Sequence, residues 1–193
     1  MNFDATITHN AGIDYGIVYG NEKIVFIKCG RGGSYQGYDE KYAKMAQRLH
    51  SKHGYTVICA SNPIKPSLTY DVDKSVIEDV IVEKQWTDFE IRLIGSSNGA
   101  YQNLFLANLL PQVKGILCIN MPLMINFHKI KENLQALDTV QKTVVYGTKD
   151  ASYAYLPILE IQHYPLFRMI RVQDADHRFQ NRTDDFIALA DLI

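Results

Sequence analysis

Short apolar runs and amphipathic stretches alternate along the chain. The runs are rich in β-branched residues and largely uninterrupted by polar ones, a pattern that favours strands covered on both faces. They lie at residues 24–27, 56–59, 91–94, 115–120, 143–146 and 169–172. Residues 3–20 have the pattern of a hairpin that precedes the first run.

Between the runs, apolar residues recur at the three- and four-residue spacing of a helix that packs one face on a sheet. These stripes lie within residues 42–49, 76–81, 100–110, 130–137 and 186–193, with Thr183 or Asn181 available as the N-cap of the last. Alternating strands and helices predict an α/β fold, a mostly parallel, doubly wound sheet flanked by helices. No repeat or long linker divides the chain, so residues 1–193 are expected to form a single domain.

The loops that follow the apolar runs are the expected place for chemistry, because ligands of such sheets bind beyond the carboxyl ends of the strands. The segment Gly95-Ser96-Ser97-Asn98-Gly99 follows the run at 91–94 and precedes a helical stretch. This G-x-S-x-G pattern in a strand-turn-helix context is typical of a nucleophile elbow, which presents its serine at a sharp turn. Ser97 is therefore the candidate nucleophile; the alternative is a turn serine between two glycines that cap a strand and a helix.

A serine hydroxyl is a weak nucleophile without a base and a group that orients the base. His177 lies in the loop after the last apolar run, and Asp150 follows the run at 143–146. The chain order Ser97, Asp150, His177 is that of one known class of catalytic triad. Asp150 can also be read as a loop or helix-capping aspartate. The fallback acids are Asp138, Asp174 and Asp176, of which the last two are close in sequence to His177.

The first run leads into Gly30-Arg31-Gly32-Gly33. Acyl transfer passes through an oxyanion that two backbone N–H groups stabilise, and the amides of Asn98 and Arg31 are the candidates. The glycines at 30–33 also allow a phosphate-binding turn, and hence a nucleotide- or phosphate-binding α/β protein. Tyr35 stands where the G-x-G-x-x-G pattern needs its third glycine, which disfavours that interpretation.

Together these segments resemble the α/β-hydrolase family over residues 24–193. The resemblance implies a sheet of eight strands or slightly fewer, and hydrolysis of an ester, thioester or amide through an acyl-enzyme on Ser97, without metal or organic cofactor. Two features depart from the family. Cys29 precedes Gly30 where histidine is common, and the interval 122–143 has room for little beyond one helix where many members carry a cap.

The short interval predicts a compact domain with no cap and an open site, which favours a small or solvent-extended substrate and a carboxylesterase-like activity. The candidate pocket residues are Tyr35, Tyr38, Tyr153 and Phe179. A different interpretation is a hydrolase fold that serves as a catalytically idle binding or interaction module, because a fold does not dictate a function.

The composition limits the kinds of partner that the protein is expected to bind. The formal net charge is -1 and 21% of residues are charged, which gives no footprint of nucleic-acid binding. No segment has the length of an apolar membrane span, and the N-terminus lacks a signal-peptide pattern, so a cytoplasmic location is expected. The three cysteines lie in apolar runs without metal-binding spacing, as expected of reduced, buried residues. The expected partner is a small-molecule ester or acyl substrate; oligomeric state carries no sequence signal.

Overall fold

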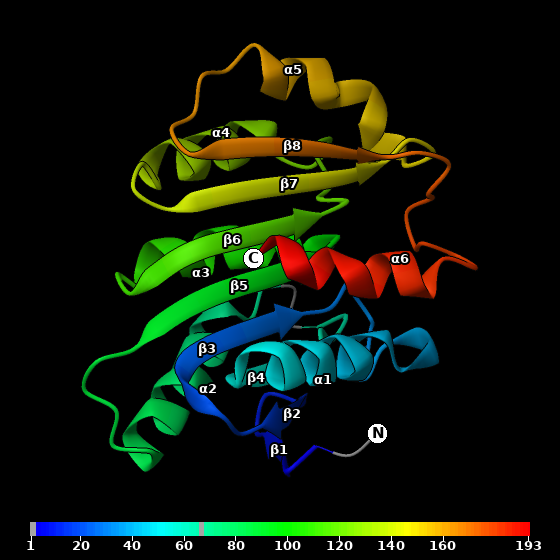
Figure 1. The fold of residues 1–193 in the computed structure, drawn as a ribbon. Coiled ribbons are helices and arrows are strands. Elements are labelled where there is room, and N and C mark those ends of the chain that lie inside the picture. Colours follow the sequence, from blue (N-terminus) through cyan, green and yellow to red (C-terminus); the bar gives the residue numbers. More distant parts are fainter. Residues whose placement is uncertain (1–2, 66–67) are drawn as a thin grey trace.

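The computed structural model describes residues 3–65 and 68–193, which form a three-layer α/β structure (Figure 1). Its central sheet has eight strands in the order β1-β2-β4-β3-β5-β6-β7-β8. The strands are β1 (Ala5–His9), β2 (Ile13–Val18), β3 (Asn21–Lys28), β4 (Tyr55–Ala60), β5 (Glu90–Ser96), β6 (Val113–Ile119), β7 (Gln141–Gly147) and β8 (Phe167–Val172). All six predicted strands and the leading hairpin are confirmed.

Most of the sheet is parallel. The hairpin strands β1 and β2 pair antiparallel, and β2 runs antiparallel to β4. From β4 across to β8, every neighbouring pair is parallel. The carboxyl ends of these strands therefore meet at one edge of the sheet, where the sequence places the candidate site.

Helices cover both faces of the sheet (Figure 1). The helices are α1 (Lys41–His53), α2 (Tyr70–Glu83), α3 (Asn98–Leu109), α4 (Phe127–Ala136), α5 (Leu156–Glu160) and α6 (Thr183–Ala188), with short 3₁₀ helices at Tyr38–Glu40, Ala151–Tyr155 and Leu189–Leu192. In the figure, α1 and α6 lie on one face and α2 and α3 on the other. The predicted doubly wound arrangement is confirmed.

Two apolar cores result, one beneath each helix layer. Along β3, Ile24 and Phe26 contribute to the core under α2 and α3, whereas Val25 and Ile27 contribute to the core under α1 and α6. The alternation follows from the two-residue period of a strand, which sends successive side chains to opposite faces. Because both faces are covered, the strand reads as one continuous apolar run.

The segment between β6 and β7 contains α4 and no added domain, which confirms the predicted absence of a cap. The prediction missed α5 and the 3₁₀ helix at Ala151–Tyr155, because both are too short to show a helical period. In addition, α5 has Pro157 in its first turn. The predicted N-cap of α6 is wrong. Arg182 holds that position without a side-chain cap, and Thr183 is already the first helical residue.

Among the described residues, none of the helices combines the length and the apolar character that crossing a membrane requires. Cys29, Cys59 and Cys118 are buried free thiols, as expected from their positions in apolar runs.

An ion pair lies in the interior next to the edge that carries the candidate site. Nζ of Lys28, the last residue of β3, lies 2.8 Å from Oδ1 of Asp73 on α2, and both residues are fully buried. Asp73 also accepts hydrogen bonds from the hydroxyl groups of Tyr15 (2.9 Å) and Thr69 (3.3 Å). Burial raises the pKa of the Asp73 carboxyl, whereas Lys28 and the two hydroxyl groups oppose that shift by stabilising its charged form.

Removing one partner of this pair should destabilise the fold strongly, because it leaves a buried carboxylate without its countercharge. We expect Lys28→Met to lower the free energy of unfolding by about 3–5 kcal/mol. Lys74→Met is the matched control, because it breaks the partly exposed pair of Lys74 with Glu78 on α2 and should cost about 0–1 kcal/mol. Urea unfolding followed by circular dichroism measures both. Equal losses in the two variants would contradict the prediction.

Candidate active site

Ser97 stands at the turn between β5 and α3. Its backbone has φ 54° and ψ −125°, a left-handed conformation that a residue with a side chain adopts only under strain. The N–H of Ser97 donates to the carbonyl oxygen of Ile119 at the end of β6 (2.8 Å), which helps to hold the turn in place. The serine side chain is partly exposed.

The two glycines around Ser97 are required by close backbone contacts. A Cβ atom on Gly95 would lie 2.4 Å from Cα of Ala100. A Cβ atom on Gly99 would lie 2.3–2.4 Å from the carbonyl oxygens of Cys29 and Lys28. Both distances are far below van der Waals contact, so the sharp turn tolerates no side chain at either position, as the sequence pattern predicts.

The structure brings the three predicted catalytic residues together. Nε2 of His177 lies 2.9 Å from Oγ of Ser97, and Nδ1 of His177 forms a short hydrogen bond with Oδ2 of Asp150. The three residues come from the loops after β5, β7 and β8, whose carboxyl ends lie at the same edge of the sheet. This geometry assigns the imidazole a tautomer in which Nδ1–H donates to Asp150 and Nε2 accepts the proton of Ser97.

Asp150 makes both kinds of contact that the sequence allows, because it caps a helix and also bonds His177. Its Oδ1 accepts a hydrogen bond from the N–H of Ser152 (2.7 Å) and so caps the following 3₁₀ helix, while Oδ2 contacts His177. The Asp150 side chain is only 1% exposed, whereas that of His177 is 46% exposed. The cap therefore orients a carboxylate that is shielded from solvent toward an imidazole that solvent can reach.

The fallback acids have other contacts. Asp174 pairs with Lys149 (3.2 Å), and Oδ1 of Asp176 accepts hydrogen bonds from the N–H groups of Arg178 and Gln180 (3.0 and 2.9 Å). Asp138 precedes β7 and thus lies at the opposite end of that strand from Asp150.

The loop at residues 30–33 lies directly against Ser97. A Cβ atom on Gly30 would lie 3.3 Å from Cβ of Ser97. Asn98 is the first residue of α3, so its backbone N–H belongs to the positive end of a 12-residue helix. The amide of Arg31 lies in the adjacent loop, and Cys29 just before it is a buried thiol whose burial raises its pKa to about 12.

The four predicted pocket residues lie in different environments. Phe179 is 2% exposed and packs edge-on against Phe186 in the core under α6. Tyr35 packs against Phe3, and Tyr153 packs partly against the core on the other face. Tyr38 is 82% exposed.

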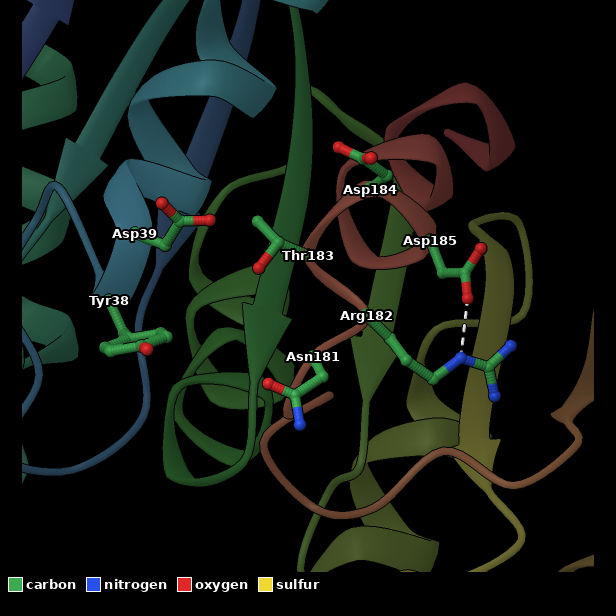
Figure 2. A pocket seen from close by; sticks show the side chains of 7 residues that line it. All are labelled: Tyr38, Asp39, Asn181, Arg182, Thr183, Asp184 and Asp185. Carbon is green, nitrogen blue, oxygen red and sulfur yellow. Dashed lines mark hydrogen bonds and ion pairs between the residues drawn. The ribbon is translucent and has the colours of Figure 1, made fainter.

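Tyr38 lines a polar cavity of about 580 Å³ beyond the loop that carries His177 (Figure 2). Its other lining residues are Asp39, Asn181, Arg182, Thr183, Asp184 and Asp185. Figure 2 shows the ion pair that Arg182 and Asp185 form among these residues; its N–O distance is 2.6 Å. Neither Ser97 nor His177 lines this cavity, so it is separate from the constellation described above.

Sequence reasoning missed Asn120, which organises the part of the candidate site around His177. This buried residue follows β6 with a positive φ of 48°. Its Nδ2 donates to the carbonyl oxygens of Asp176 (3.1 Å) and His177 (3.0 Å), and its Oδ1 accepts from the N–H of Gly147 (2.9 Å). One side chain thus joins the loop that carries His177 to the end of β7, just before Asp150. A polar residue at a strand end was the available signal.

A second support comes from α1. Nζ of Lys41 donates to the carbonyl oxygen of Arg178 (3.3 Å) and lies 4.1 Å from the ring centroid of Phe186. Burial lowers the pKa of Lys41, and the nearby Asp176 opposes that shift. Among the described residues, no three His, Cys, Asp or Glu side chains are grouped so as to hold a metal ion.

Solved structures with the same fold cover nearly the whole chain. A lidless α/β serine hydrolase from Xanthomonas campestris matches with a TM-score of 0.67 at 20% identity, over 97% of this chain and 91% of that one. The chain has the α/β-hydrolase fold. Dienelactone hydrolase from Anabaena variabilis matches with a TM-score of 0.74 at 15% identity, over 100% and 94% of the two chains. An α/β serine hydrolase homologue from Coxiella burnetii matches with a TM-score of 0.67 at 16% identity, over 98% and 97%.

No protein-family model matches the sequence, and no curated protein matches it. The assignment to the α/β-hydrolase fold therefore rests on the three-dimensional structure. At these identities it describes the architecture, and the chemistry has to be argued from the residues themselves.

Replacing Asn120 should destabilise this α/β-hydrolase fold. Asn120→Ala removes three hydrogen bonds and leaves the buried N–H of Gly147 without its partner, so we expect a loss of about 1–3 kcal/mol in the free energy of unfolding. The control is Asn133→Ala on α4, which breaks bonds of a partly exposed side chain and should change stability by at most about 0.5 kcal/mol. Chemical denaturation measures both; an Asn120→Ala protein as stable as the wild type would refute the role.

Proposed function

We propose that the protein is a serine hydrolase that cleaves an ester, thioester or amide through an acyl-enzyme on Ser97. The observation that carries the proposal is the continuous hydrogen-bonded chain from Ser97 through His177 to Asp150, with the serine held in a strained turn. An ordinary turn serine needs neither the strain nor the partners. The likeness to hydrolases of the same fold supports the proposal at the level of architecture.

The first half of the reaction transfers the acyl group to the enzyme. Nε2 of His177 takes the proton of Ser97 as Oγ attacks the carbonyl carbon of the substrate, and Asp150 stabilises the resulting imidazolium. The imidazolium then protonates the leaving group as the tetrahedral intermediate collapses. In the second half, His177 activates a water molecule that attacks the acyl-enzyme and releases the acid.

The oxyanion of each tetrahedral intermediate needs hydrogen-bond donors, and we assign this role to the backbone N–H groups of Asn98 and Arg31. The first lies at the N-terminus of α3, and the second lies in the loop that contacts Ser97 through Gly30. Donors of this kind typically contribute about 3–4 kcal/mol each to the stability of the transition state.

The open site favours a small or solvent-extended ester, hence a carboxylesterase-like activity. Only α4 lies between β6 and β7, and the His177 side chain is 46% exposed, so a substrate can extend into solvent. The protein of the same fold from Xanthomonas campestris is described as a serine hydrolase without a lid.

Covalent labelling separates an active hydrolase from an idle fold. Wild-type protein should react with a fluorophosphonate probe at Ser97 and hydrolyse p-nitrophenyl acetate, because the hydroxyl is activated by His177. Ser97→Ala should abolish labelling and lower turnover by about three orders of magnitude or more. Ser75→Ala, which changes an exposed serine on α2, serves as the control and should retain both activities. If the wild type is not labelled, or if Ser97→Ala hydrolyses the ester as fast as the wild type, the proposal fails.

The pH dependence of turnover tests the base. His177 accepts a proton only when it is neutral, so kcat/KM should decrease as the pH is lowered from about 8 to about 5. Stopped assays with p-nitrophenyl acetate, corrected for the spontaneous rate at each pH, measure the profile. A profile that is flat over this range would contradict the assignment of the base.

A further inference from the structure

Three carboxamide side chains lie beneath the nucleophile and the oxyanion loop. Asn62 follows β4, whereas Asn98 and Gln102 lie about one turn apart on α3. Nδ2 of Asn62 and Nε2 of Gln102 both donate to Oδ1 of Asn98 (3.1 and 2.8 Å). Nε2 of Gln102 also donates to Oδ1 of Asn62 (2.9 Å). We call Asn62, Asn98 and Gln102 the amide cluster.

Asn62 also makes three hydrogen bonds with the loop that follows β3. Its Nδ2 donates to the carbonyl oxygen of Cys29 (2.9 Å), and its own carbonyl oxygen accepts from the N–H of Gly32 (2.6 Å). Its N–H donates to the carbonyl oxygen of Gly33 (3.0 Å). The peptide of Arg31 is therefore bracketed on both sides by bonds to one fully buried residue.

Gln102 fixes the orientation of the cluster. Its Oε1 accepts from the N–H (2.7 Å) and the hydroxyl (2.9 Å) of Thr69, the residue that precedes α2. Because a carboxamide has its acceptor and its donors on opposite sides, Nε2 must then face Asn62 and Asn98. Gln102 is fully buried and Thr69 is 2% exposed, so water does not compete for these bonds.

This arrangement connects the two segments that carry the candidate oxyanion donors. The amide of Asn98 moves with the first turn of α3, and the amide of Arg31 moves with the loop. Donors stabilise an oxyanion only when both lie about 2.7–3.1 Å from the position that the oxygen takes in the transition state. The distance between these two N–H groups must therefore be set by the folded protein. Asn62 can set it because it is hydrogen-bonded to both segments.

We propose that Asn62, oriented by Gln102, is a positioning residue that sets the spacing of the two oxyanion amides. The inference rests on the proposed function and adds the element that holds its oxyanion site together. Asn62 does not touch the reacting atoms; it acts through the backbone of Arg31 and Asn98. Its bond to the carbonyl oxygen of Cys29 also holds the loop at the position where this chain has a cysteine and the α/β-hydrolase family commonly has a histidine.

The test uses two variants that weaken the cluster in different ways. Asn62→Ala removes its bonds to Cys29, Asn98 and Gln102. Gln102→Glu keeps an acceptor for Thr69 but replaces the donating nitrogen by an oxygen. Both should lower kcat for p-nitrophenyl acetate by about 10- to 100-fold and change KM by less than about threefold, because a displaced donor weakens the transition state more than the ground state.

The matched control is Asn108→Ala on the same helix. Nδ2 of Asn108 donates to Oδ1 of Asn133 and to the carbonyl oxygen of Leu104 (3.0 Å each), but the residue is exposed and lies well along α3 from Ser97. Its kcat and KM should equal those of the wild type. Circular dichroism and the melting temperature of each variant show whether it is folded at the assay temperature.

Inhibition by benzeneboronic acid distinguishes positioning from a general structural role. Its boron accepts the electron pair of Oγ of Ser97, the serine proton passes to His177, and the product is an anionic tetrahedral boronate with one of its hydroxyl oxygens near the oxyanion amides. We expect the Ki of this inhibitor to rise in Asn62→Ala and Gln102→Glu by about the factor by which kcat/KM falls, and to stay unchanged in Asn108→Ala.

The outcomes separate this inference from the proposed function. A wild type that neither hydrolyses the ester nor binds the boronic acid overturns both. A wild type that does both, with folded variants that keep its kcat and Ki, overturns the positioning role alone; so does a loss of kcat with an unchanged Ki. If Asn62→Ala is not folded, Gln102→Glu decides the question by the same criteria.

Discussion

The close contact between the first turn of α3 and the end of β3 is the constraint on which the rest of the site depends. Gly99 lies so near the carbonyl oxygens of Lys28 and Cys29 that no side chain fits between them. This contact brings the N-terminus of the helix against the oxyanion loop and forces the backbone of Ser97 into its left-handed conformation. The strained turn at Ser97 and the position of the α3 N-terminus against the loop at residues 30–33 are therefore products of one steric fit, which packing of α3 on the sheet must stabilise against the strain.

A network of buried hydrogen bonds connects this contact with the interior of the protein. The carbonyl oxygen of Lys28 is one of the two atoms that leave no room for a side chain on Gly99. The ammonium group of Lys28 donates to Asp73, and Asp73 accepts a hydrogen bond from Thr69, which precedes α2. Thr69 in turn bonds Gln102 of the amide cluster. Buried ion pairs and amides contribute little net stability compared with apolar packing, but their directional bonds permit few alternative arrangements. We infer that this network serves the precision of the site more than the stability of the fold.

The sequence predicts the architecture well because two clear patterns of apolar residues mark its elements. Uninterrupted apolar runs and helical stripes mark the strands and the longer helices, and the sheet edge then follows from parallel topology. The same reasoning leads to Ser97, Asp150 and His177, since each follows a different run, and the structure places His177 within hydrogen-bonding reach of the other two.

Asn62, Gln102 and Asn120 could not be predicted in this way. Asn62 and Asn120 each follow a strand, where polar residues are common, and Gln102 is one of several polar residues in α3. Their importance lies in partners that are distant in sequence, such as Asn62 with Asn98 or Asn120 with His177. A single chain gives no signal for such pairs. The short α5 was missed for a related reason, because it is too brief to show a period.

The absence of a cap explains why so much of the order lies beneath the site. Enzymes with lids exclude water and complete their sites on closure. Here only α4 lies between β6 and β7, and His177 remains half-exposed. For the hydrolase that we propose, hydrogen-bond donors must then already stand in place before the substrate arrives, because solvent dipoles compete for every group that can reorient. Asn62, which bonds the loop after β3, and Asn120, which bonds the loop of His177, are both fully buried. The backbone groups that they hold are therefore fixed from the interior of the protein.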